Sequence, residues 1–163
     1  MNIPLRYRDI RKSLPDEVSF GAGGIELFPA AEIERRQVGY SVNPDGSSLC
    51  TGDDGAWRPT WIVIGHETGL GDPIFIDRSS AALPVYTAMH GAGIWEPNPV
   101  ASTAEAFARC FSEFSRIAAG RANPAEHDAN PLRDDERAQF LARIAELNGT
   151  SIAPEFWDVM LEF

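Results

Sequence analysis

The segment from Trp61 to Arg78 constrains the fold of this chain more than any other. It contains two short apolar runs, Trp61–Ile64 and Ile74–Ile76, separated by a segment with three glycines. Runs of aromatic and β-branched residues this short are typical of buried strands, since a helix would need more residues. The intervening glycines can take positive φ values without a steric penalty from a Cβ. The sequence therefore predicts an antiparallel hairpin whose loop runs from Gly65 to Asp72.

This loop contains residue types that catalytic motifs use, but not in a catalytic pattern. His66-Glu67 matches the start of the zinc-peptidase motif His-Glu-x-x-His, yet Leu70 stands where a histidine is required. Gly69-x-Gly71 is followed by a strand rather than a helix, so no helix N-terminus is expected there to bind a phosphate. Asp72, next to a glycine, is typical of a turn residue that bonds nearby backbone. The residues alone indicate a folded acidic domain without a recognisable active site.

Further strands are expected on both sides of the hairpin. Short apolar runs at 25–28 and 83–89 have the composition of strands. The polar segment 41–58 is expected to form a loop that leads directly into the hairpin, and the segment 91–99, with its glycines and prolines, is expected to form another. The strand signals therefore concentrate in the first half of the chain.

Helix signals dominate the last third of the chain. Ser102 and Glu105 have the spacing of a capping box, which predicts a helix with Ser102 at its N-cap. Apolar residues three or four positions apart predict its buried stripe, which comprises Phe107, Cys110, Phe111, Phe114 and Ile117. An exposed linker is expected at 121–130. Asn130-Pro131 then predicts the start of a second long helix that ends near Leu147, and a short terminal helix follows.

This order of signals predicts an α+β fold. We expect a mainly antiparallel sheet of four to six strands, with helices packed against it and a helical C-terminal tail. The length of 163 residues suits a single domain, 1–163, that buries a core without disulfides. A parallel, doubly wound sheet is not expected, because strands and helices do not alternate along the chain.

The sequence of the hairpin and of the segments around it resembles that of a known family. The matching pieces, in order, are Trp61-Ile-Val-Ile-Gly65, Gly71-Asp72-Pro-Ile-Phe-Ile-Asp77, Pro84-Val85-Tyr86 with His90-Gly91, and Val100-Ala101-Ser102 leading to Phe107. Their order and spacing resemble the core of the SMI1/KNR4 superfamily, also called SUKH. The chain departs from that pattern between residues 15 and 23, where the segment is too short for the family's helix. The resemblance implies a core at about 14–119 and a helical extension at 121–163.

Two classes of function follow from these observations. The resemblance implies a non-enzymatic protein-binding domain similar to SUKH immunity proteins, which bind and block a bacterial toxin that is commonly a nuclease. In fungi the family includes a regulator of cell-wall synthesis. The alternative is a small enzyme, or a binder of a small ligand, that uses the cleft beside the loop from Gly65 to Asp72. The absence of a catalytic motif and the analogy with the family favour the first class.

Charge and composition exclude several partners. The formal net charge of −10, from 24 acidic and 14 basic residues, argues against nucleic acid because phosphates would be repelled. Cys50 and Cys110 have no cysteine or histidine partner at metal-ligand spacing, so neither a metal nor another cofactor is expected. No secretory signal and no apolar run of roughly 18 residues is present, which predicts no membrane association and a cytoplasmic location.

The candidate binding site is a set of acidic and aromatic residues expected near one end of the sheet. It comprises Asp53, Asp54, Trp57, Glu67, Asp72 and Trp95. Like charges gain nothing by clustering, whereas a basic protein partner would associate faster with such a cluster. Trp57 is then the apolar anchor within an acidic rim. The alternatives are that the carboxylates form an ordinary solvated face and that the tryptophans close the edge of the core.

Overall fold

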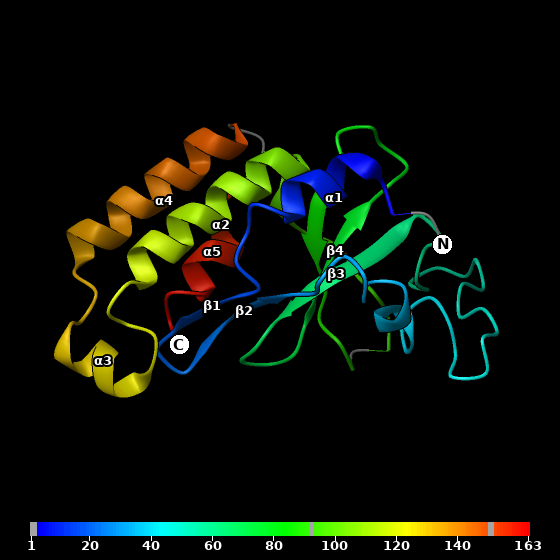
Figure 1. Ribbon diagram of the computed structural model, residues 1–163, viewed down its shortest axis with the longest axis horizontal. Helices are drawn as coiled ribbons and strands as arrows, with labels where there is room; N and C mark the ends of the chain where they lie inside the picture. The colour runs from blue at the N-terminus through cyan, green and yellow to red at the C-terminus, as the bar shows by residue number, and fades with distance from the viewer. Residues whose placement is uncertain (1–2, 92, 150–151) are drawn as a thin grey trace.

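The computed structural model of the protein describes residues 3–91, 93–149 and 152–163. Within these residues the chain forms six strands and five α-helices, and this α+β arrangement confirms the predicted fold class (Figure 1). The strands are β1 (Glu17–Phe20), β2 (Gly23–Leu27), β3 (Trp61–Glu67), β4 (Pro73–Asp77), β5 (Val85–Thr87) and β6 (Asn98–Ala101). The helices are α1 (Leu5–Arg11), α2 (Ala104–Ala118), α3 (Pro124–Ala129), α4 (Asp134–Asn148) and α5 (Glu155–Val159), with a 3-10 turn η1 at Arg35–Gln37.

The sheet is built by consecutive antiparallel pairing in the order β1-β2-β3-β4-β5-β6. The predicted hairpin is its centre, although β3 continues past Gly65 to Glu67 and shortens the loop. Gly65 lies where β2 passes close to β3, and a Cβ there would come within 2.2 Å of the Glu26 carbonyl oxygen. A glycine is therefore required at this crossing.

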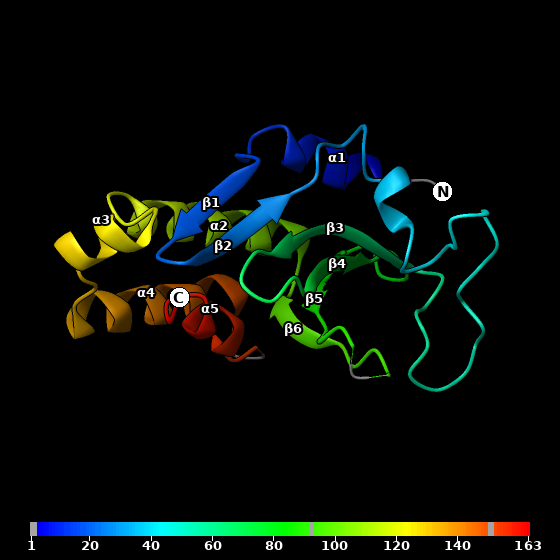
Figure 2. The same ribbon diagram turned by 90° about the horizontal axis from the view of Figure 1, so that it is seen from below.

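Helices and aromatic side chains cover the sheet. The stripe predicted for α2 is buried as expected, with α4 packed beside it and α1 contacting its N-terminal part (Figures 1 and 2). On β4, Phe75 packs against Trp57 and Trp61, with ring centroids 4.9 and 4.8 Å away. Since side chains alternate along a strand, Ile74 and Ile76 point to the opposite face of the sheet. Both faces of the hairpin are consequently buried.

A buried glutamine extends the sheet where β2 ends. The amide of Gln37 accepts the Val63 N–H at 3.0 Å and donates to the Val63 carbonyl oxygen at 2.9 Å. Gln37 is 1% exposed. The pairing of β2 with β3 reaches only Gly65, so the side chain satisfies backbone groups that would otherwise be buried without partners.

Two strands were not predicted. β1 occupies the short segment before Gly21, and β6 falls in the segment that was expected to be a loop. Both are four residues long, and β6 contains Pro99, which is tolerated because β6 lies at the edge of the sheet. Strands this short, with weak apolar patterns, form because they pair with an adjacent strand of the sheet, so their own sequence does not predict them.

The predicted helix boundaries also need correction. Thr103, not Ser102, caps α2, because its hydroxyl accepts the Ala106 N–H at 2.9 Å. The predicted linker contains α3, and α4 begins at Asp134 rather than after Asn130. Asn130 instead follows α3, where its carbonyl oxygen accepts a bond of 2.8 Å from the buried Arg121. Among the described residues, none of the helices combines the length and apolar character needed to cross a membrane.

Candidate functional site

The turn between β3 and β4 is organised by the carboxylate of Glu67. Its oxygens accept the backbone N–H groups of Gly69, Leu70 and Asp72 at 2.8 Å each. Glu67 is 4% exposed, so these donors, rather than water, satisfy its carboxylate oxygens. The turn at 68–72 is thus held together by an internal carboxylate, which explains how a glycine-rich segment adopts one conformation.

Asp72 ties this turn to the chain that follows β5. Its Oδ1 atom accepts the backbone N–H of His90 at 2.8 Å and lies 2.9 Å from the ring Nδ1. In a neutral imidazole this contact requires the tautomer with the proton on Nδ1, because the carboxylate oxygen accepts the bond. Burial, and secondly the charge of Asp72, raise the pKa of Tyr40 above its ordinary value. Asp72 therefore links the turn to the segment after β5.

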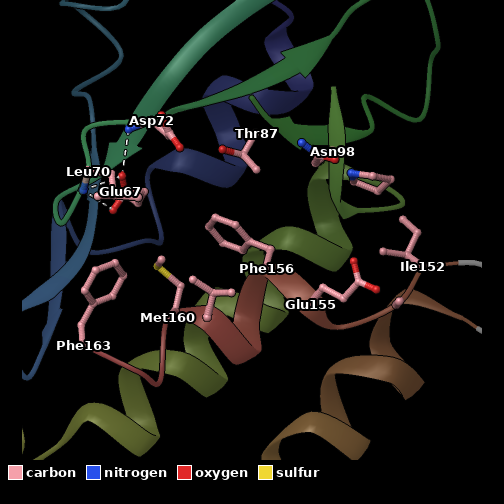
Figure 3. A pocket seen from close by; sticks show the side chains of 13 residues that line it. Glu67, Leu70, Asp72, Thr87, Asn98, Ile152, Glu155, Phe156, Met160 and Phe163 are labelled. Atoms are coloured by element: carbon pink, nitrogen blue, oxygen red, sulfur yellow. Dashed lines mark hydrogen bonds between the residues drawn. The ribbon is translucent and has the colours of Figure 1, made fainter. Parts of the chain in front are cut away.

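A cavity of about 330 Å³ opens beside this turn, between the sheet and the C-terminal segment (Figure 3). It is lined by Glu67, Leu70, Asp72, Thr87, Asn98, Pro99, Ile152, Ala153, Glu155, Phe156, Val159, Met160 and Phe163. Three of these residues are acidic, and no lysine, arginine or histidine is among the described residues that form the lining. The cavity thus combines an apolar wall with a negative rim.

The C-terminal segment is fixed to the edge of the sheet by two side chains. Trp157 Nε1 and Asn148 Nδ2 both donate to the Val100 carbonyl oxygen, at 3.1 and 3.3 Å. The Ser102 N–H donates to Asn148 Oδ1 at 3.2 Å. These bonds satisfy part of the outer edge of β6, which protects the edge from pairing with another strand. They also place α5 against the cavity.

Phe163 closes the other end of the cavity wall. Its carbonyl oxygen accepts the Ala22 N–H at 3.0 Å, and its ring occupies space that glycines leave open. A Cβ at Gly23 would lie 2.6 Å from this ring, and one at Gly69 would lie 2.2 Å from it. Glycines from two separate parts of the chain therefore accommodate one aromatic side chain.

The carboxylates of the predicted acidic cluster line two hollows of the structure. Glu67 and Asp72 both line the cavity beside the turn. Asp53 and Asp54 instead line a second hollow of about 310 Å³, together with Trp57 and Trp95. Asp45 accepts bonds from the N–H and hydroxyl of Ser47, which is a local turn contact. The expectation of one acidic face stays a prediction, because a third hollow shares Tyr40 and Trp95 with the second one and reaches Gly71 of the turn.

Trp57 is a core residue rather than the exposed anchor that was expected. It is 2% exposed, its Nε1 donates to the Trp61 carbonyl oxygen at 3.3 Å, and the two rings meet edge to face. Trp95 is half-buried and packs against Trp57 with centroids 5.1 Å apart. The alternative interpretation, that the tryptophans close the edge of the core, holds for Trp57. The reason is that a loop rich in polar residues still needs an apolar contact to dock on the sheet.

The residues of the cavity wall were not identified from the sequence. Two of these residues, Leu70 and Val159, are large apolar side chains that are 66% and 48% exposed. The one available signal was Leu70, an apolar residue inside a turn of small and polar residues. The contribution of α5 depends on how the tail folds back, and no local pattern encodes that.

Within the described part of the chain, no group of three or more histidine, cysteine or acidic side chains is placed to hold a metal ion. Asp72 and His90 form a pair of the kind used in proton transfer, but no hydroxyl or thiol nucleophile bonds to this histidine among the described residues. Comparisons of the chain with protein families, curated proteins and solved structures find no match. The chemistry of the site is therefore argued from its geometry.

Proposed function

We propose that this chain is a non-enzymatic binding domain that captures and neutralises a basic protein. The observation that carries the proposal is the cavity beside the β3–β4 turn, which has an apolar wall, three acidic residues and no basic residue in its described lining. Apolar surface supplies contact energy in a protein interface, while complementary charge raises the association rate. The formal net charge of −10 extends the same attraction over the whole molecule.

The resemblance to SMI1/KNR4 (SUKH) proteins suggests what kind of partner this protein binds. By that analogy the protein is an immunity protein, and its partner is a toxin domain such as a nuclease, whose substrate groove is basic. A cytoplasmic location, where both cysteines stay reduced, belongs to the same proposal. The analogy suggests the class of partner, whereas the cavity suggests which surface of this protein binds it.

The proposed surface differs from the one suggested by the sequence. It keeps Glu67 and Asp72 and replaces Trp57 with the apolar residues of the cavity wall, because Trp57 is not accessible to a partner. Asp53, Asp54 and Trp95 line a second hollow and are not in the lining of this cavity. We assign them no direct contact with the partner, although the two aspartates contribute to long-range attraction.

A second candidate is a protein that binds a small ligand, or a small enzyme, at the same cavity. Its volume of about 330 Å³ lies near the lower limit of known ligand pockets, about 300–1,000 Å³. The Asp72–His90 contact would supply a proton acceptor. We rank this function second because Asp72 bonds both the backbone and the ring of His90, as a structural link does.

Co-expression with the product of the neighbouring gene tests the proposed function. If that product is basic and stops growth, the wild-type chain should restore growth and co-purify with it. The double variant Asp72→Asn/Glu155→Gln should lose both effects, whereas the matched variant Asp53→Asn/Asp54→Asn should retain them. Equal rescue by both double variants would contradict the assigned surface. A small molecule that remains bound in native mass spectra of the purified chain would support the second candidate instead.

A further inference from the structure

The three acidic residues of the cavity are not equivalent. Both oxygens of Glu67 are occupied by backbone N–H groups of the turn. Both contacts of Asp72 with His90 are made by Oδ1, which leaves Oδ2 for another donor. Glu155, in the first turn of α5, is exposed and makes no side-chain hydrogen bond or ion pair within the described chain. The cavity therefore offers two carboxylates to an incoming cation.

The wall between these carboxylates is aromatic and aliphatic. In Figure 3 the ring of Phe156 lies between Asp72 and Glu155, with Met160 and Phe163 continuing the wall below the turn. Such a wall matches a long side chain that has methylene groups along its stem and a charge at its end. A planar guanidinium also stacks on an aromatic ring while its edge donates to carboxylates, which a compact ammonium does less well.

The size of the cavity fits one side chain rather than a folded element. About 330 Å³ is too little for a whole helix of a partner, and the exposed Leu70 and Val159 lie at its border, where a partner surface would continue. We propose that the cavity binds the side chain of a single arginine presented by the partner. This inference rests on the proposed function only for the source of that arginine, because the recognition chemistry belongs to the cavity.

Titration of the 15N-labelled protein with N-acetyl-arginine methylamide, followed by NMR, tests this inference without a partner. At low salt, the amides of Leu70, Asp72, Val159 and Phe163 should shift in a saturable way. The citrulline derivative has nearly the same shape without the charge, and it should leave these amides unchanged. The lysine derivative should bind at least threefold more weakly, since it cannot both stack and form a fork of hydrogen bonds.

Single-residue variants test whether Glu155 contributes to arginine binding. Glu155→Gln should weaken arginine binding by about threefold to tenfold, because a neutral amide replaces an exposed carboxylate, while the thermal midpoint stays close to that of wild type. The control Asp54→Asn should bind as wild type does. Equal shifts with citrulline, equal binding of lysine, or shifts centred on Asp53 and Asp54 would each overturn the inference. If the arginine probe binds but no basic protein partner does, the proposed function is wrong and this inference stands. If a basic partner binds but the arginine probe does not, this inference is wrong and the proposed function stands.

Discussion

The two acidic segments of this protein, the β3–β4 turn and the loop at 41–58, use similar residues in opposite ways. In the turn, the carboxylates of Glu67 and Asp72 are held by backbone and side-chain donors beside an apolar cavity. In the loop, Asp45 stabilises its own turn, and Asp53 is exposed to solvent. The loop contributes its aromatic residue, Trp57, to the core instead. Acidic composition alone therefore does not locate a binding surface, and we propose that fixed carboxylates next to exposed apolar side chains mark one.

The largest expected effect tests whether the 41–58 loop is anchored by its tryptophan. Trp57→Ala should lower the free energy of unfolding by about 3–5 kcal/mol, because it removes a fully buried indole and leaves a cavity. Urea denaturation measures this change. Trp95→Ala, at a half-buried position in the same cluster, should cost less than half as much. An unchanged stability for Trp57→Ala would contradict its burial and support the exposed anchor role that the sequence suggested.

The second effect tests the buried carboxylate of Glu67 that holds the turn. Glu67→Ala leaves the N–H groups of three turn residues without their acceptor, and we expect a loss of about 2–4 kcal/mol in the free energy of unfolding. Asp54→Ala in the loop is the matched control and should change stability by less than about 0.5 kcal/mol. If both substitutions have equal effects in urea denaturation, the contrast between the two segments is wrong.

A smaller effect tests the space that Gly69 leaves for Phe163. Gly69→Ala should cost about 1–2 kcal/mol, because the new methyl group overlaps the ring and displaces it from the cavity wall. The same substitution in a Phe163→Ala background should cost much less, since the ring is absent. The double-mutant cycle measures this coupling. Additive effects would mean that the ring does not lie against Gly69.

The smallest effect, on reactivity rather than stability, distinguishes the loop from the core. Burial raises the pKa of the Cys110 thiol in α2 to about 12, whereas Cys50 in the loop is half-buried. A thiol reagent at neutral pH should therefore modify Cys50 alone in the native protein, and both cysteines after unfolding. Mass spectrometry of the labelled peptides identifies the site. Equal labelling of both thiols under native conditions would show that α2 opens as readily as the loop.

The predictable parts of this fold are those with strong local patterns. The hairpin centred on β3 and β4 and the buried stripe of α2 were predicted because each pattern is carried by contiguous or periodic apolar residues. β1 and β6 were missed because their definition comes from the neighbouring strands. Ser102 was taken as the cap of α2, although Thr103 next to it is equally able to accept the bond.

The site was less predictable than the fold, for reasons of distance along the chain. Glu67 and Asp72 belong to the hairpin, so its loop already placed them together. Phe156 and Phe163 reach the cavity through contacts between segments far apart in sequence, such as the bonds from Trp157 and Asn148 to Val100 and the bond from the Ala22 N–H to the Phe163 carbonyl oxygen. Trp57 was predicted to be exposed because its neighbours in the sequence are polar. Its buried side chain instead anchors this loop to the core. Such contacts follow from the folded arrangement and have no local signature.

The most direct test of the central claim is the association rate with a basic partner at two ionic strengths. For wild type, the rate should fall several-fold between low salt and physiological salt, where the Debye length is about 8 Å. Our account predicts that Asp72→Asn/Glu155→Gln slows association and reduces this salt dependence, whereas Asp53→Asn/Asp54→Asn changes both far less. If the second variant has the larger effect, or if neither changes the rate, the cavity beside the β3–β4 turn is not the binding surface.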